Sequence, residues 1–122
     1  MSFAPVSFKA ADSLPAYRIV KISAANTVNI CTASTDKCIG VTVDDATAAN
    51  QAIPVAVAGV VRIQFNETCA AGNFVMANTL GMAIPAVATT AGVQVIGVCL
   101  GTVAATGTQM EVLLRPFEFG IP

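Results

Sequence analysis

The sequence predicts an all-β protein, either a small β-barrel or a β-sandwich, and three observations lead to this fold class. Residues 53–66 alternate between large apolar side chains and smaller or polar ones, which is the period of two that a strand with one buried face shows. Hydrophobic residues make up 55% of the chain, in short segments rich in alanine and valine. Turn-forming residues separate these segments at about 8–12-residue spacing, as in sandwiches and barrels.

The segment 53–66 is the element with which the other strands are expected to pair. It is longer than the usual strand of about 5–6 residues. Gly59 lies at its middle, where a glycine commonly marks a bulge or the corner of a barrel. We therefore expect one bent strand, or two strands joined at Gly59 that keep the same face buried.

The first part of the chain is expected to contain an arm and three strands. Residues 1–14 show no clean period and are expected to form an extended N-terminal arm. Strands are expected at residues 16–23 and 27–32, separated by an Ala-Ala-Asn turn, and at residues 38–44 after a polar turn. The first strand is centred on Ile19, Val20 and Ile22, and in the other two valine and isoleucine form one apolar face.

The last part of the chain is expected to contain four strands and a second arm. A hairpin joins residues 73–77 to residues 82–87, with Gly81 in the turn. Residues 93–103 are apolar at both parities, which predicts a strand in the middle of the structure. Residues 109–115 form the last strand, and residues 116–122 form a C-terminal arm. The β domain between the two arms therefore covers residues 15–115.

Two segments of the sequence are similar to each other. Residues 39–57 align without gaps to residues 96–114, both starting with Ile-Gly-Val, and at the same offset Tyr17 aligns with Phe74 and Ile30 with Val87. Two interpretations remain open at this point. The chain contains two similar β halves, or strands rich in alanine and valine resemble each other by chance.

Composition excludes several partners. Charged residues make up 11% of the chain and the net charge is −1, so we expect no nucleic-acid ligand. No apolar run approaches the roughly 18 residues of a membrane helix, so we expect no membrane partner. The N-terminus lacks the pattern of a secretion signal. Scarce charge beside much apolar surface suggests that part of the surface meets a protein partner.

No residues form a recognisable catalytic or metal site. The chain has no histidine, and its serines lie outside nucleophile motifs. The four cysteines show no C-x-x-C spacing, and Asp44 and Asp45 have no third ligand at calcium-loop spacing. We therefore expect no enzyme activity, no metal and no cofactor. A disulfide between two of the cysteines remains open, although the thiols of an intracellular product usually stay reduced.

Aromatic residues gather at the two ends. The chain has six phenylalanines and one tyrosine, and four of these seven lie in the expected arms. Aromatic side chains dominate interface energetics, so we favour docking of the arms on a partner or a neighbouring subunit. The alternative is that the arms fold back and plug the ends of the barrel. The candidate contact residues are Phe3, Val6, Phe8, Phe117 and Phe119.

Several short segments share glycine and strand patterns with a known family. They are Ala-Gly-Val-Val-Arg-Ile at 58–63, Ala-Ala-Gly-Asn-Phe-Val at 70–75, Leu-Gly-Met-Ala at 80–83, Ala-Tyr-Arg-Ile-Val-Lys-Ile-Ser at 16–23, Cys-Ile-Gly-Val at 38–41, Ile-Gly-Val at 96–98 and Val-Leu-Leu at 112–114. Over residues 14–115 this pattern resembles the decoration, or cement, proteins of tailed-phage capsids. The aromatic C-terminal tail departs from the family pattern.

The resemblance implies a structural virion protein. Members of that family have a small β-barrel or β-sandwich, bind the outside of the head, often as homotrimers, and stabilise it by bridging major capsid subunits. The expected partners are therefore the major capsid protein and further copies of this chain, and the expected location is the outer capsid surface after synthesis in the host bacterial cytoplasm. The alternative is a β-sandwich binding module on a virion, either a head fibre base or a glycan-binding domain.

Overall fold

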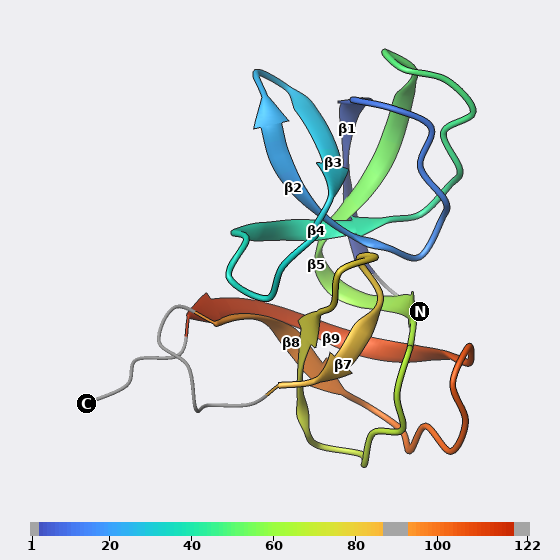
Figure 1. Cartoon of the computed structure of the whole chain (residues 1–122), viewed down its shortest axis with the longest axis vertical. Helices are drawn as coiled ribbons and strands as arrows, with labels where there is room; N and C mark the ends of the chain where they lie inside the picture. Colours follow the sequence, from blue (N-terminus) through green and yellow to red (C-terminus); the bar gives the residue numbers. More distant parts are fainter. Residues whose placement is uncertain (1–2, 87–92, 119–122) are drawn as a thin grey trace.

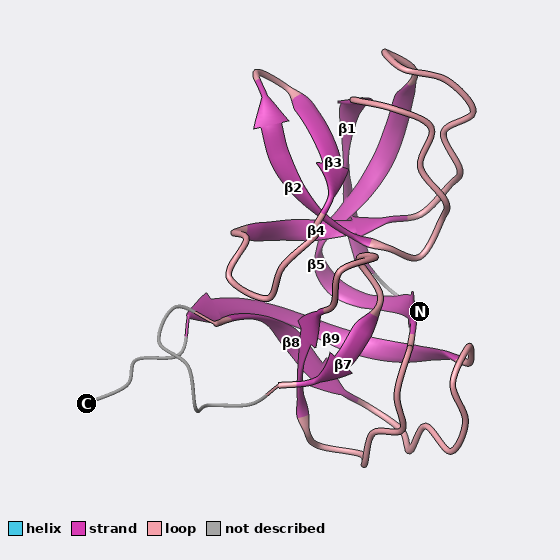
Figure 2. Ribbon diagram, viewed as in Figure 1, coloured by secondary structure: helices cyan, strands magenta, loops and turns pink. Residues whose placement is uncertain are grey.

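The computed structural model describes residues 3–86 and 93–118, and within them every regular element is a β-strand. The prediction of an all-β fold is confirmed (Figure 2). The strands are β1 (Phe3–Ala10), β2 (Ile19–Ala24), β3 (Thr27–Ile30), β4 (Cys38–Thr42), β5 (Ala52–Gln64), β6 (Phe74–Ala77), β7 (Ala83–Pro85), β8 (Gln94–Cys99) and β9 (Gln109–Glu118).

The first five strands close into a small barrel. Their order is β1-β3-β2-β4-β5, and β1 also pairs with β5, which completes the ring. The neighbours run antiparallel except β1 and β3, which run parallel. In Figure 1 these strands form the upper lobe, coloured blue to green. The expected small β-barrel is therefore present in this part of the chain.

The remaining strands build a second sheet on the other half of β5. Its order is β5-β9-β8-β6-β7, antiparallel throughout, and it forms the lower lobe in Figure 1. A parallel bridge between Phe65, just after β5, and Ala83 of β7 brings the two ends of this sheet together. This repeats the parallel pairing of β1 with β3. We call residues 3–57 unit one and residues 58–118 unit two.

The strand β5 belongs to both units, and it bends at Gly59 as the sequence predicts. Gly59 has a φ of 87°, in the left-handed region that glycine enters without steric cost. The pairing of β1 with β5 shifts register between Phe3 and Pro5, next to this bend. Before the bend β5 pairs with β1 and β4, and after it with β9.

The two units have the same internal register, which confirms that the chain contains two similar β halves. In unit one, Val41 faces Ala56 across β4 and β5, and in unit two, Val98 faces Leu113 across β8 and β9. The offset between these pairs is the 57 residues found in the sequence. Each unit also has an isolated antiparallel β-bridge in which two residues exchange both backbone hydrogen bonds. These residues are Leu14 and Ala46 in unit one and Cys69 and Val103 in unit two.

The single offset of 57 is wrong for the first strands of each unit, where the structure matches residues 55 apart. Tyr17, which donates its N–H to the carbonyl of Thr42, corresponds to Gly72, which donates to Cys99 in the same way. Tyr17 therefore matches Gly72 and not Phe74, whereas Val87, which the sequence aligned with Ile30, lies outside the described residues. Alanine-rich strands resemble one another at several offsets, so sequence similarity alone does not select the register.

A glycine permits the close packing of β4 on β5 in unit one and of β8 on β9 in unit two. A Cβ added to Gly40 would overlap the carbonyl oxygen of Ala56 and approach Val55 Cγ1 to 2.9 Å. A Cβ on Gly97 would overlap the carbonyl oxygen of Leu113 and approach Val112 Cγ1 to 3.0 Å. The clash is the same in both units, so the Ile-Gly-Val repeat of the sequence reflects a steric requirement.

The units share a hydrophobic core. One buried cluster lies within unit one and contains Val20, Val28, Ile53 and Val55. The larger cluster fills unit two and also contains Ile19, Cys31, Val41 and Ala56 of unit one. Backbone hydrogen bonds cross the same boundary, from Ile19 N to Gly81 O at 2.8 Å, from Gln64 N to Tyr17 O at 3.0 Å and from Gln94 N to Ser34 O at 2.7 Å.

We predict that Gly40→Ala and Gly97→Ala each lower the free energy of unfolding by roughly 1–3 kcal/mol, because the new methyl group meets rigid backbone. Gly101→Ala is the matched control, since its Cβ would meet Met110 Sδ at 2.7 Å, on a flexible side chain that can move away. Urea unfolding followed by circular dichroism measures all three. Equal midpoints for the three variants would contradict the steric requirement at Gly40 and Gly97.

Candidate interaction surface

The N-terminal candidate residues lie on β1, the strand that closes unit one. Phe3 pairs with Gly59 of β5 through the backbone. Val6 is 44% exposed, whereas Phe8 is half-buried and packs against the core cluster of unit one. The residues expected as an arm are thus extended and hydrogen-bonded to β5 and, at Lys9 and Ala10, to β3. Contact of these residues with a capsid or another subunit stays a prediction.

The C-terminal candidate residues lie at the end of β9. This strand continues to Glu118, and Phe117 pairs with Val95 of β8 through the backbone. Phe119 lies outside the described residues. Strands β1 and β9 meet at one point of β5, because Gly59 pairs with Phe3 on one side and with Leu114 on the other.

The exposed apolar surface is larger than the terminal candidates suggest. Five large apolar side chains in the described part of the chain are more than two-fifths exposed, and the sequence analysis named just one of them as a contact residue. They are Val6, Ile22, Phe74, Leu80 and Leu100. Besides Val6, the residues Ile22 and Phe74 lie on strands, where the alternation of faces could have identified them once the buried face was known. These side chains supply apolar surface on both units.

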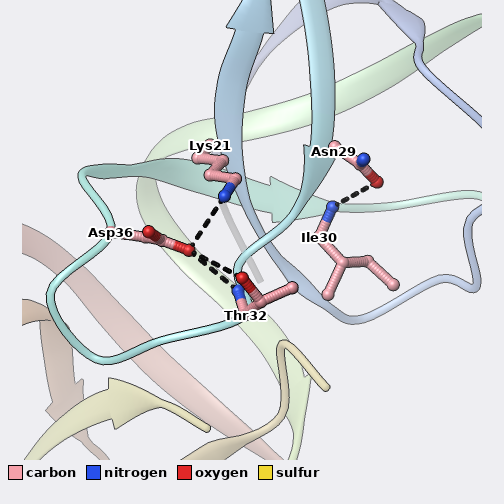
Figure 3. A network of polar contacts seen from close by, with 5 residues as sticks. All are labelled: Lys21, Asn29, Ile30, Thr32 and Asp36. Carbon is pink, nitrogen blue, oxygen red and sulfur yellow. Dashed lines mark hydrogen bonds and ion pairs between the residues drawn. The ribbon is translucent and has the colours of Figure 1, made fainter. Parts of the chain in front are cut away.

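A polar network fixes the loop that follows β3 (Figure 3). The carboxylate oxygen Oδ2 of Asp36 accepts hydrogen bonds from the backbone N of Thr32 at 2.9 Å, from Thr32 Oγ1 at 3.3 Å and from Lys21 Nζ on β2 at 3.0 Å. The Thr32 backbone bond and then the Lys21 ammonium hold the pKa of Asp36 below its ordinary value. The loop carries Cys31 at its start, so the network also orders a residue of the shared core.

The four cysteines are unpaired thiols in the structure. Cys31, Cys69 and Cys99 are buried and belong to the core of unit two, and Cys38 is half-buried. Burial raises the pKa of Cys31 to about 12 and that of Cys38 and Cys69 to about 11, so these three groups are protonated at neutral pH. Their contribution here is apolar packing.

The described residues contain no pocket and no cluster of three or more residues suited to hold a metal ion. In the same residues, no helix is long and apolar enough to cross a membrane. In its described part, the molecule offers a partner exposed apolar side chains on a β-sheet protein.

Comparison with known proteins identifies a shared fold. No protein-family model matches the sequence, and no curated protein matches it. Among solved structures, the chain is similar to the head fiber gp8.5 N base of bacteriophage phi29, with a TM-score of 0.72 and 15% sequence identity. The similarity covers 93% of this chain and 95% of that chain. It therefore includes both units and their arrangement.

We predict that Asp36→Asn lowers the free energy of unfolding by about 1 kcal/mol at pH 7, since the ionised carboxylate accepts the bonds of the network. A carboxylate whose pKa is lower in the folded state stabilises the protein above the ordinary aspartate pKa of about 4, and this contribution is lost as the pH falls toward the lowered value. The difference between Asp36→Asn and the parent protein should shrink accordingly in urea titrations at decreasing pH. Asp44→Asn, at an exposed position, is the control, and a constant difference at all pH values would contradict the assignment.

We predict that deletion of residues 1–10 opens unit one, because β1 supplies the strand that joins β5 to β3. Thermal unfolding should shift to lower temperature and residues of β2 and β3 should become sensitive to protease. Val6→Thr, which keeps the strand and changes one exposed side chain, serves as the control. An unchanged melting temperature after the deletion would show that β1 is dispensable for closure of the barrel.

Proposed function

We propose that this chain is a structural protein of a bacteriophage head, located on the outer capsid surface in contact with the major capsid protein, where it forms the base of a head fibre. The observation that carries the proposal is the fold shared with the phi29 head fiber N base along nearly the whole of both chains. A likeness of both units, in the same arrangement, is a stronger argument than the likeness of one small barrel would be.

The surface chemistry supports a role in assembly. Exposed apolar side chains occur on both units, and the charged fraction of 11% allows two surfaces to approach without desolvating many charges. Aromatic side chains contribute strongly to protein interfaces, and Phe74 is a partly exposed aromatic side chain, with Leu100 as a further exposed apolar one. We propose no catalytic activity and no cofactor.

A second role on the same particle is cementing, in which each copy bridges two major capsid subunits. The tandem arrangement favours it, since two units of the same fold give one molecule two places at which it can contact a capsid subunit. Together with the resemblance to phage decoration proteins, it also favours a homo-oligomer, with a trimer as the expected state.

Quantitative mass spectrometry of purified particles tests the proposal and separates the two roles. We expect this chain in the particles of the virus that encodes it. A small copy number relative to the major shell protein would support the fibre base, and a copy number comparable to the shell protein would support cementing. Absence from particles that retain their other head proteins would overturn both roles.

A further inference from the structure

Unit one uses a defined apolar face to bind unit two. Ile19, Val41 and Ala56 are neighbours across β2, β4 and β5, and each is fully buried in the cluster that fills unit two. Val43, just after β4, packs against the same cluster. The adjacent residues Val20 and Val55 belong instead to the core of unit one. The face is therefore the outer side of the unit-one sheet, covered by unit two.

Unit two carries the equivalent face in the same register. Phe74, Val98 and Leu113 are neighbours across β6, β8 and β9, as Ile19, Val41 and Ala56 are in unit one. Leu100 corresponds to Val43. The N–H of Leu100 donates to the carbonyl oxygen of Glu111 at 3.0 Å, and the N–H of Val43 donates to the carbonyl oxygen of the equivalent residue, Pro54, at 3.2 Å. We call this face the row surface: Phe74, Val98, Leu100 and Leu113.

The row surface is apolar and accessible. Phe74 is 41% exposed and Leu100 is 49% exposed, while Val98 and Leu113 are half-buried. The three equivalents Ile19, Val41 and Ala56 are 0% exposed. The face that unit two buries on unit one is therefore accessible on unit two itself. Two of its three strand positions carry larger side chains there, Phe74 in place of Ile19 and Leu113 in place of Ala56.

Unit one exposes the complementary surface. In unit two, Val61, Ala77 and Leu114 are buried in the cluster that receives Ile19, Val41 and Ala56. Two of their equivalents in unit one are much more accessible, Val6 at 44% and Ile22 at 46%, and the third, Val57, is half-buried at the edge of the unit-one core. The strand pairing establishes which residues correspond. Val6 corresponds to Val61, because Val6 pairs with Val55 and Val61 pairs with the equivalent Val112. Ile22 corresponds to Ala77, because Ile22 pairs with Val28 and Ala77 pairs with the equivalent Ala83. We call this second face, Val6, Ile22 and Val57, the end surface.

We propose that two copies of this chain associate head to tail, with the row surface of one copy packed against the end surface of the next. The contact repeats between chains the one that joins the two units within a chain, so its shape is already realised in the structure. The two surfaces differ, so the association is heterologous and extends to a ring or a filament instead of stopping at a symmetric dimer. The inference concerns the purified chain and does not depend on the proposed role in the virion.

Sedimentation velocity of the purified full chain over a range of concentrations tests the proposal. We expect species larger than the monomer for the parent protein. Leu100→Glu on the row surface and Ile22→Glu on the end surface should each weaken association by at least about tenfold, since each places a charge at the centre of an apolar contact. Leu80→Glu is the matched control, because Leu80 is 55% exposed and lies outside both surfaces.

A mixture of the two variants tests the head-to-tail geometry. Leu100→Glu keeps an intact end surface and Ile22→Glu keeps an intact row surface, so an equimolar mixture should form a 1:1 dimer that neither variant forms alone. A parent protein that stays monomeric at the highest concentrations, or a mixture that stays monomeric, would overturn the proposal. Circular dichroism melts verify folding, and Leu100→Ser with Ile22→Ser replace any glutamate variant that fails to fold.

Discussion

The bend of β5 at Gly59 is the constraint on which the rest of the structure depends. A straight strand of this length would remain in the barrel of unit one. Strand β9 would then have no free edge of β5 with which to pair, and β8, β6 and β7 could not follow it. The left-handed φ at Gly59 redirects the strand, so that its first half pairs with β1 and β4 and its second half with β9. For any residue with a Cβ, this conformation would cost about 1–2 kcal/mol. The shared core then follows, because one strand places both units within contact distance.

The two units show that an almost identical backbone accepts different side chains according to what covers it. Three turn positions have positive φ in both units, occupied by Tyr17, Asn26 and Asn50 in unit one and by Gly72, Gly81 and Gly107 in unit two. The conformation is a property of the fold, and glycine is one solution among several. On the sheets, Ala56 is fully buried where unit two covers it, and the larger Leu113 is half-buried at the same register position of unit two.

Much of the local structure could be predicted from the sequence, because strand periodicity is a local signal. The alternation over residues 53–66 predicted β5 and its bend, and the repeat at Ile-Gly-Val predicted the equivalence of β4 and β8. The pairing of β1 could not be predicted, since closure of the barrel depends on contacts between residues far apart in the chain. Aromatic side chains near the ends therefore suggested extended arms outside the β domain, although residues 3–10 are part of the sheet.

The exposed surfaces were also beyond sequence reasoning. Residues 93–103 are apolar on both faces, and the prediction of a central strand is confirmed, since β8 lies between β9 and β6. Yet Val98 and Leu100 point to the accessible face, and burial of both faces was the natural expectation for such a segment. An apolar second face has the same sequence pattern whether the molecule itself or a partner covers it.

The tandem order of the units has a consequence for synthesis on the ribosome. All five strands of unit one have been made once residue 57 is complete, so its barrel can close while unit two is still being translated. Until then Ile19, Val41 and Ala56 face water, and a nascent chain with an apolar sheet face is prone to aggregate. Emergence of β6, β8 and β9 ends this interval. Slow translation or truncation after unit one would therefore leave this apolar face of the barrel exposed to water and prone to aggregate, because only unit two buries it.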